Sequence, residues 1–503
     1  MSKKLFISIL VLCILTLGLL VLDLMKVIIS KWIIIILMCA IAGLSVFFIV
    51  KGEKKAPKVI STILAVVTIA ISFFAISMSP YFNSISLHNF VAAAPYDAVV
   101  SADDACDEID YATRTFQRIH PKHSDEAVMK TADKIKEQIQ EDGGVTVNQL
   151  SADIERVLSK AGDPHTYAWA DYNDYLVPKD YDMNKMEKGV WHLVKVNGLT
   201  AEDVLSQNPD LVSFDTKSCG EFEVDRFLNP GGIPYLQILD FYGFDTQKDI
   251  TCTYENESGE QMTETYHPDD FMSYDEYLEK NVKEEDEEAE EAEPPIATFE
   301  IDKDKSLAVL TYNDVWYEDE YKECLQDMFT QVKEKGIKNV VVDLRGVGGD
   351  RMVMDFFVNT KAAEEFIRYL DVDNYNGMSS TWRLGFYDLN KNEENCKNKR
   401  YSDLTFNGNC YVLTSSDTFG PASTFAMLIK DNDLGTLIGE PTGSDPNGYG
   451  EDVWFATPKT KIKVIVSTKQ FYRADRDCKD KCVTPDIECD ADKAFDALYE
   501  AID

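Results

Sequence analysis

Three uncharged apolar runs open the chain and constrain its fold more than any other feature. They are Leu5–Leu22, Trp32–Val50 and Val59–Met78, with lengths of 18, 19 and 20 residues. An α-helix needs roughly 20 apolar residues to cross the hydrocarbon core of a bilayer. A single such run is also typical of a cleaved signal peptide. Three runs joined by short charged loops predict a three-helix transmembrane anchor, and the alternative is one signal peptide followed by buried core helices.

Lysines around these runs predict how the anchor is oriented. The N-terminus and the second loop together carry six lysines, whereas the first loop carries two. Because loops rich in Lys and Arg stay in the cytoplasm, we expect a cytoplasmic N-terminus. Three spans then place the chain after residue 80 outside the cell membrane.

The part beyond the apolar runs is strongly acidic. The first 80 residues carry a net charge of +6, which leaves −43 for the remainder of a chain whose total is −37. Phosphate backbones and anionic lipid surfaces repel such a charge. We therefore exclude nucleic acid as a partner and expect the charge to keep the domain soluble.

Cysteine usage leaves the redox state open. Nine of the eleven cysteines follow the apolar runs, and Cys478 and Cys482 are close enough in sequence to form a disulfide, which an external location permits. The sequence contains neither a CxxC motif nor a Cys/His cluster with zinc-ligand spacing. No metal site and no cofactor are predicted.

Composition and periodicity divide the chain into six regions. We expect a transmembrane anchor (1–80), a linker (81–104), a helical subdomain (105–175), a β-rich region that is either PDZ-like or purely structural (176–276), an acidic linker (277–295) and an α/β core (296–495). Within the β-rich region, Ile233–Ile238 is expected to be a strand. In the core, strands alternate with helices, one of them over Met352–Leu370, which predicts a layered sheet with parallel pairs.

Two segments of the core have the pattern of a buried strand that opens into a turn and then a helix. They contain VVDLRGVGGD (341–350) and CYVLTSSDTFGPASTF (410–425). Backbone amides in such turns and at helix N-termini stabilise developing negative charge. α/β proteins therefore place reactive groups at these positions.

Together with GDPHTY (162–167), QRIHPKHSD (117–125), GEPTG (439–443), NGYGE (447–451) and CVTPDIE (482–488), these segments resemble the tail-specific, or C-terminal-processing, serine peptidase family. The resemblance covers residues 105–490. It implies a ClpP/crotonase-like α/β protease core, a polypeptide substrate or peptide ligand, and hydrolysis by a serine nucleophile. Some members use a Ser–Lys pair, but no lysine occurs between Asp431 and Pro458, where that lysine would lie.

Other members of the family use a Ser–His–acid triad, and their histidine comes from a Gly-Asp-x-His-Thr motif. The matching residue is His165, and an imidazole is suited to proton transfer near neutral pH. The alternative role for His165 is a hydrogen-bonded cap of the third helix of the subdomain. By position, the triad's acid matches Asp480, with Asp477 as second choice, although both belong to a charged run that is typical of an exposed loop.

The position that matches the nucleophilic serine holds Gly420, which is followed by Pro421. Glycine and proline suit the start of a helix, but no hydroxyl is present there. Ser423, one helical turn further on, and Ser416, before the turn, are the alternative nucleophiles. Without either, the chain is a pseudoprotease that binds peptides and does not cleave them.

By resemblance, the oxyanion is bound by backbone amides of the glycine turn, with Gly346, Gly348 and Gly349 as candidates. Pro421 has no N–H to add, and Arg345 is expected to form a structural ion pair under the turn. The sequence thus predicts a membrane-anchored, multi-pass, extracytoplasmic homologue of these peptidases. A structural membrane component is the least supported alternative.

Overall fold

We describe a computed structural model of the 503-residue chain. The described residues are 2–24, 31–51, 55–82, 91–183, 185–186, 190–228, 232–256, 258–281, 295–313, 317–346, 360–384 and 387–502. They divide into two compact units. The first unit consists of 1–90, 383–388 and 453–455, and the second of the remaining residues.

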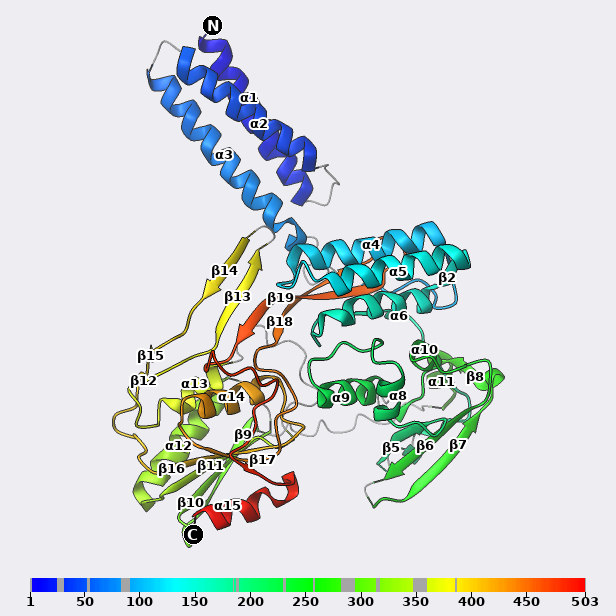
Figure 1. The fold of residues 1–503 in the computed structure, drawn as a ribbon, viewed down its shortest axis with the longest axis vertical. Helices are drawn as coiled ribbons and strands as arrows, with labels where there is room; N and C mark the ends of the chain where they lie inside the picture. The colour runs from blue at the N-terminus through cyan, green and yellow to red at the C-terminus, as the bar shows by residue number, and fades with distance from the viewer. Residues whose placement is uncertain are drawn as a thin grey trace. The chain divides into compact units, whose positions relative to one another are not determined.

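The apolar runs form three helices, which pack side by side in the first unit (Figure 1). Two of them, over Ile33–Lys51 and Lys55–Ala75, are long and apolar enough to cross a membrane, a criterion that buried core helices and signal sequences also meet. The remaining apolar stretch, Lys4–Leu20, is shorter: at 1.5 Å per residue it spans only about 25 Å. The prediction of three spans is therefore corrected to two candidates. The helices are α1 (Ser2–Leu24), α2 (Lys31–Lys51) and α3 (Lys55–Phe82).

The second unit begins with helices whose N-termini are capped by polar side chains. The side chain of Asp125 accepts hydrogen bonds from the N–H groups of Ala127 and Val128, and Gly143 ends the same helix in the left-handed region with φ 81°. Ser101 and Thr146 cap the other two helices. The elements are β1 (Val99–Ser101), α4 (Ala102–Ile119), α5 (Glu126–Asp142), β2 (Gly144–Thr146), α6 (Val147–Leu158), the 3-10 turn η2 (Ser159–Ala161) and β3 (Tyr167–Trp169).

The β-rich region contains a three-stranded antiparallel sheet in the order β5-β6-β7. The expected strand over Ile233–Ile238 is wrong, because the chain is irregular up to Tyr235 and forms the helix α10 from Leu236 onward. This helix is buried on several sides, so its residues show no periodicity that would separate helix from strand. The elements are β4 (Leu176–Pro178), β5 (Trp191–Val196), α8 (Ala201–Gln207), α9 (Lys217–Leu228), α10 (Leu236–Phe241), β6 (Ile250–Asn256), β7 (Gln261–Tyr266), η4 (Pro268–Asp270), β8 (Phe271–Ser273) and α11 (Tyr274–Asn281). Most of the predicted acidic linker, 282–294, lies outside the described residues.

The α/β core is built on a six-stranded sheet in the order β20-β17-β16-β11-β10-β9, in which every pair is parallel except β10 with β9. Side chains alternate across it: Val340 and Val342 pack under helices α12 to α14, whereas Val341 faces α15. The elements are β9 (Ala297–Asp302), β10 (Leu307–Tyr312), α12 (Asp319–Lys335), β11 (Asn339–Asp343), α13 (Lys361–Ile367), β12 (Asn374–Tyr375), β13 (Ser379–Leu384), β14 (Tyr387–Lys391), β15 (Cys396–Lys397), β16 (Asn409–Thr414), α14 (Gly420–Asp431), β17 (Thr436–Gly439), β18 (Tyr449–Ala456), β19 (Lys463–Tyr472), β20 (Ile487–Glu488), η5 (Ala491–Lys493) and α15 (Ala494–Ile502).

This sheet explains where the two strand–turn–helix segments lie. β11 and β16 are neighbouring parallel strands, so their carboxyl ends meet at one edge of the sheet. The predicted helix over Met352–Leu370 is described only from residue 360, and there it is α13. Cys478 and Cys482, considered as a disulfide, are free thiols.

Candidate active site

His165 lies in a short loop that a buried carboxylate holds in place. The loop follows Gly162, which ends the 3-10 turn with φ 62°. The side chain of Asp163 is fully buried and accepts hydrogen bonds from the backbone N–H of His165 (2.9 Å), the Thr166 hydroxyl (2.6 Å) and the His120 ring (3.1 Å). The next strand, β3, pairs with β19. The loop is therefore tied to both the helical part and the sheet that carries β19.

His120 has a defined tautomer in this arrangement. Its Nδ1 accepts a hydrogen bond from the N–H of Lys122 at 2.9 Å, so the ring proton is on Nε2 and is donated to Asp163. Burial acts to raise the pKa of Asp163, but the hydrogen bonds from His120 and Thr166 and the nearby imidazoles outweigh it and lower the pKa to about 2. The loop thus contains a buried carboxylate that is ionised at neutral pH.

The His165 side chain is held differently from that of His120. It is 37% exposed, and its Nδ1 lies 3.8 Å from the Asp163 carboxylate, which is beyond hydrogen-bond distance. Among the described residues, this Nδ1 has no hydrogen-bond partner. His120 therefore takes the structural hydrogen-bonding role, and the ring of His165 is left available for chemistry.

The ring of His165 helps to line a cavity of about 50 Å³ at the N-terminus of α14, together with Gly420, Ser423, Ser444 and Asp215. Gly420, the first residue of α14, has φ 49°, in the left-handed region. A Cβ built on it would meet no atom within 4 Å. The structure thus brings together His165 and two of the residues considered at the nucleophile position.

The hydroxyl groups at this helix start form a directed chain of hydrogen bonds. The Gly420 N–H donates to Ser444 Oγ (3.0 Å), Ser444 Oγ donates to Ser423 Oγ (2.9 Å), and Ser423 Oγ donates to the carbonyl of Thr418 (2.6 Å). Ser423 is 1% exposed. Ser416 is not among the residues that line the cavity.

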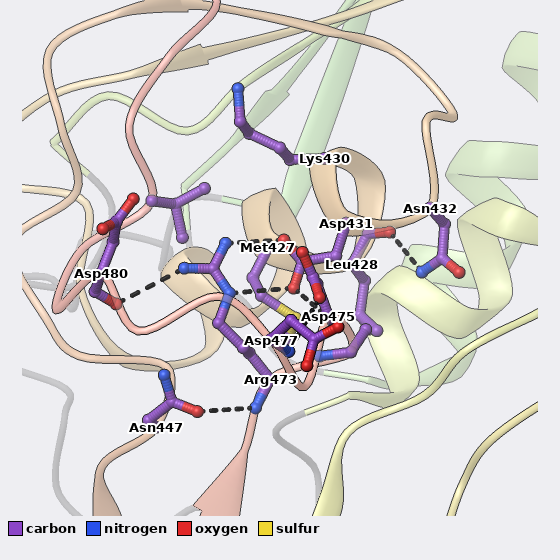
Figure 2. Close-up of polar contacts among 12 residues, drawn as sticks. Met427, Leu428, Lys430, Asp431, Asn432, Asn447, Arg473, Asp475, Asp477 and Asp480 are labelled. Atoms are coloured by element: carbon purple, nitrogen blue, oxygen red, sulfur yellow. Dashed lines mark hydrogen bonds and ion pairs between the residues drawn. The ribbon is translucent and has the colours of Figure 1, made fainter.

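The structure places the predicted acids in a loop held by Arg473 (Figure 2). The side chains of Arg473 and Asp431 are each only 3% exposed and form a bidentate ion pair at 2.6 and 3.0 Å. The backbone carbonyl of Asp480 accepts from Arg473 at 3.5 Å, and the Asp480 residue is exposed. Neither Asp480 nor Asp477 belongs to the described lining of the His165 cavity. The carboxylate at the Nδ1 of His165 is that of Asp163.

The glycine turn is described as far as Gly346, whose N–H donates to the Ser415 hydroxyl at 3.2 Å. Gly348 and Gly349 lie outside the described residues. Arg345 forms the structural ion pair expected of it, with Asp343 at 2.7 Å, and also donates to the Ala491 carbonyl.

Sequence reasoning missed two residues of the cavity, Ser444 and Asp215. Ser444 belongs to the stretch in which the lysine of a Ser–Lys pair would lie, and its hydroxyl next to Gly443 was the available signal. One carboxylate oxygen of Asp215 accepts the Asp445 N–H at 3.0 Å, whereas the other is buried without a hydrogen-bond partner among described residues. Burial raises the pKa of Asp215. No motif marks this residue, because its partner is 230 positions away.

A metal site is not formed by the described part of the chain, which contains no group of three or more His, Cys, Asp or Glu side chains placed to hold an ion. The nearby Cys219 lines the same cavity, and burial raises the pKa of its thiol well above the usual value. It is therefore a protonated, unreactive thiol.

Comparison with known proteins agrees with this architecture. Residues 306–489 match the model of peptidase family S41, which confirms the resemblance to the tail-specific peptidases. A serine-to-alanine mutant of CPAF is similar over 79% of this chain and 95% of its own, with a TM-score of 0.52 and 10% identity. Mature CPAF is similar over 80% of this chain and 95% of its own, with a TM-score of 0.50 and 11% identity.

A photosystem II D1 C-terminal processing protease covers 79% of this chain and 97% of its own, with a TM-score of 0.41 and 12% identity. A search of curated proteins finds no match. At these identities the solved structures show the fold alone. Residues 306–489 thus match the S41 peptidase model, and the chain has an α/β fold like that of S41 proteases, with a helical part before it.

Proposed function

We propose that this protein is a membrane-anchored serine-type peptidase that processes polypeptides, with His165 as its general base. The observation that supports this proposal best is the cavity at the start of α14. It brings together an imidazole whose Nδ1 has no hydrogen-bond partner among the described residues, a helix N-terminus and the hydroxyl of Ser444, a partly exposed residue. These are the parts that acyl transfer requires.

Asp163 would serve as the acid of this site. Its buried carboxylate lies 3.8 Å from Nδ1 of His165, so it favours the tautomer with the proton on Nδ1 and stabilises the imidazolium that forms when Nε2 accepts a proton. Asp480 is the acid expected from its position in the sequence, and that role stays a prediction. In the structure the residue is exposed, in the Arg473 loop.

Hydrolysis of an unfolded protein such as β-casein tests the proposal, with full-length protein in detergent micelles. We expect cleavage by the wild type and a loss of about 100-fold or more in His165→Ala, because a positioned general base contributes roughly 10²–10⁴. His192→Ala is the matched control, since His192 is exposed on β5, and it should cleave like the wild type.

A second candidate function is peptide binding without cleavage. The missing hydroxyl at Gly420 and the buried, committed hydroxyl of Ser423 favour it. In that case the wild type binds β-casein but leaves it intact, and Gly420→Ser cleaves it.

The membrane anchor is part of the proposal and rests on the composition of α2 and α3. Resistance of the protein to carbonate extraction from membranes tests it. Protease protection of the soluble part then decides the role of α1. With the N-terminus inside, as the lysine distribution favours, two spans return the chain to that side, whereas three would place it on the opposite side.

A further inference from the structure

We propose that Ser444 is the nucleophile of this site, in place of the residue missing at position 420. The inference rests on the peptidase function proposed above. Ser444 is not at the family's nucleophile position and lies 24 residues after it. It comes from the loop between β17 and β18 rather than from helix α14.

The first argument is the partner of the Ser444 oxygen. Helix α14 has 12 residues, and the N–H of its first residue is donated to Ser444 Oγ at 3.0 Å. A hydrogen bond from a helix N-terminus strengthens when its acceptor becomes negatively charged. The position of Ser444 thus stabilises an alkoxide, which is what an activated serine requires.

The second argument is the contrast with Ser423. Ser423 is 1% exposed and its proton is already donated to a backbone carbonyl at 2.6 Å, so its oxygen is neither accessible nor free to lose that proton. Ser444 is partly exposed, and it donates to Ser423, a neutral hydroxyl. Rotation about the Cβ–Oγ bond of Ser444 is enough to redirect its proton into the cavity that His165 also lines.

The third argument is that the loop of Ser444 is held firmly against the turn before α14. Gly443 donates its N–H to the Thr418 carbonyl at 3.0 Å, and its own carbonyl accepts from the Thr216 hydroxyl. A Cβ at position 443 would lie 2.2 Å from the Ser416 carbonyl oxygen, so glycine is required for this close approach. The loop therefore holds Ser444 next to the helix start that carries no side chain of its own.

The cavity itself shows an unfilled polar demand. The Asp215 residue is only 9% exposed and lines the cavity. One of its carboxylate oxygens forms no well-aligned hydrogen bond with the described residues, although the Thr216 N–H lies close to the carboxylate. Its neighbour is the Cys219 thiol, a weak donor. A buried acceptor in this state is satisfied when a ligand with an N–H enters. A polypeptide substrate supplies such a group beside Ser444.

The reaction balances with these residues and water. His165 Nε2 takes the Ser444 proton while Oγ bonds to the substrate carbonyl carbon, and the carbonyl electron pair moves to oxygen. That pair returns as the C–N bond breaks, and the amine leaves with the proton from His165. Water then repeats the sequence at the ester, which releases the acid and restores the Ser444 hydroxyl.

The experiment uses full-length protein in detergent micelles, an alkyl fluorophosphonate probe mapped by mass spectrometry, and β-casein cleavage. We expect the probe on Ser444 in the wild type, because mapping depends on no variant. Ser444→Ala should lose the probe and at least about 10³-fold in kcat. Ser416→Ala removes a nearby hydroxyl outside the cavity, and it should keep both the probe and the cleavage.

The outcomes separate the inference from the function on which it rests. Cleavage that persists in Ser444→Ala, or a probe mapped to Ser423, overturns the assignment of Ser444 and leaves the peptidase function standing. A wild type that neither cleaves nor takes the probe, while Gly420→Ser does both, overturns the peptidase function and the assignment together. Ser444→Thr keeps an acceptor for the Gly420 N–H. If it retains the thermal stability but not the activity of the wild type, a purely capping role for Ser444 is excluded.

Discussion

Replacement of Asp163 by asparagine tests the arrangement that positions His165. Asparagine has the shape of aspartate, but its amide group brings two N–H donors and removes the charge. One carboxylate oxygen of Asp163 faces the His120 Nε2–H and the Thr166 hydroxyl, and the other faces the His165 N–H. In either orientation, the amide nitrogen of the introduced side chain faces a group that also donates. His120 cannot become the acceptor, because the Lys122 N–H fixes its tautomer.

The magnitude follows from the pKa of Asp163. A carboxyl pKa lowered from 3.8 to about 2 corresponds to about 2 kcal/mol of stability at neutral pH. A hydrogen-bond donor that loses its Asp163 acceptor adds to this cost. We therefore expect the free energy of unfolding to fall by about 3 kcal/mol in total, at the lower end of the range for breaking a buried pair. Because the folded pKa is lowered, the contribution is fully present above about pH 4 and is lost as the pH falls toward about 2.

Urea denaturation of the full-length protein in detergent micelles, followed by circular dichroism, measures this loss. With an m value of about 3 kcal/mol per molar urea, the midpoint should fall by about 1 M at pH 7, and the gap to the wild type should narrow below about pH 4. Asp304→Asn is the control, since Asp304 is exposed. An Asp163→Asn variant with the wild-type midpoint, or a gap unchanged at about pH 3, would refute an ionised Asp163.

Three further predictions concern residues at and around the site, and urea denaturation tests each of them. Gly420→Ala should lower the free energy of unfolding by about 1–2 kcal/mol, the cost of a left-handed conformation alone, since the added Cβ meets no atom. Gly443→Ala should lower it by about 3 kcal/mol or more, because its Cβ would collide with the Ser416 carbonyl oxygen. Equal losses in the two variants would contradict this difference in the space around the two glycines. Arg473→Met should lower the free energy of unfolding by about 3–5 kcal/mol, because it removes the ion-pair partner of the buried Asp431. The double variant with Asp431→Leu should recover most of this loss. A double variant without recovery would argue against a buried ion pair. Burial raises the pKa of Glu155 from 4.5 to about 7, so the folded state binds one more proton than the unfolded state between these pH values. The stability of the wild type should therefore fall by about 3 kcal/mol as the pH rises from about 4.5 to about 7. Glu155→Gln should remove this pH dependence, and an unchanged dependence would show that another group causes it.

The core could be predicted from the sequence because its signals are local. Buried strands such as β11 and β16 are continuous apolar runs followed by turn residues, and their residues occupy both faces of a covered parallel sheet. The helix α10 was missed because a short apolar run that is buried on several sides has the same pattern as a strand. Its Gln237 side chain binds the N–H of Leu176 and the carbonyl of Asp174, which are contacts that no periodicity reveals.

The candidate site could be predicted only in part, for a similar reason. His165 and the glycine at position 420 belong to sequence motifs, so their neighbourhood was foreseeable. Asp215 and Ser444 reach the cavity from loops, and Asp215 is bonded to a residue 230 positions away. Position along the chain points to Asp480 as the acid, which stays a prediction. The carboxylate of Asp163, two residues before His165, lies 3.8 Å from its Nδ1.

The register of α14 explains why a hydroxyl from a loop suits this site better than one from the helix. Ser423 follows Gly420 by three residues, so both lie near the same face of the helix. Every residue from Ala422 to Ile429 is nevertheless buried, because α14 packs in the same core cluster as α12 and α13. The Ser423 hydroxyl points away from solvent and donates to the carbonyl of Thr418, just before the helix. The helix start can therefore receive an accessible hydroxyl in two ways, from a side chain at position 420 or from a loop that approaches it. Glycine at positions 420 and 443 permits the second arrangement, and Ser444 occupies it.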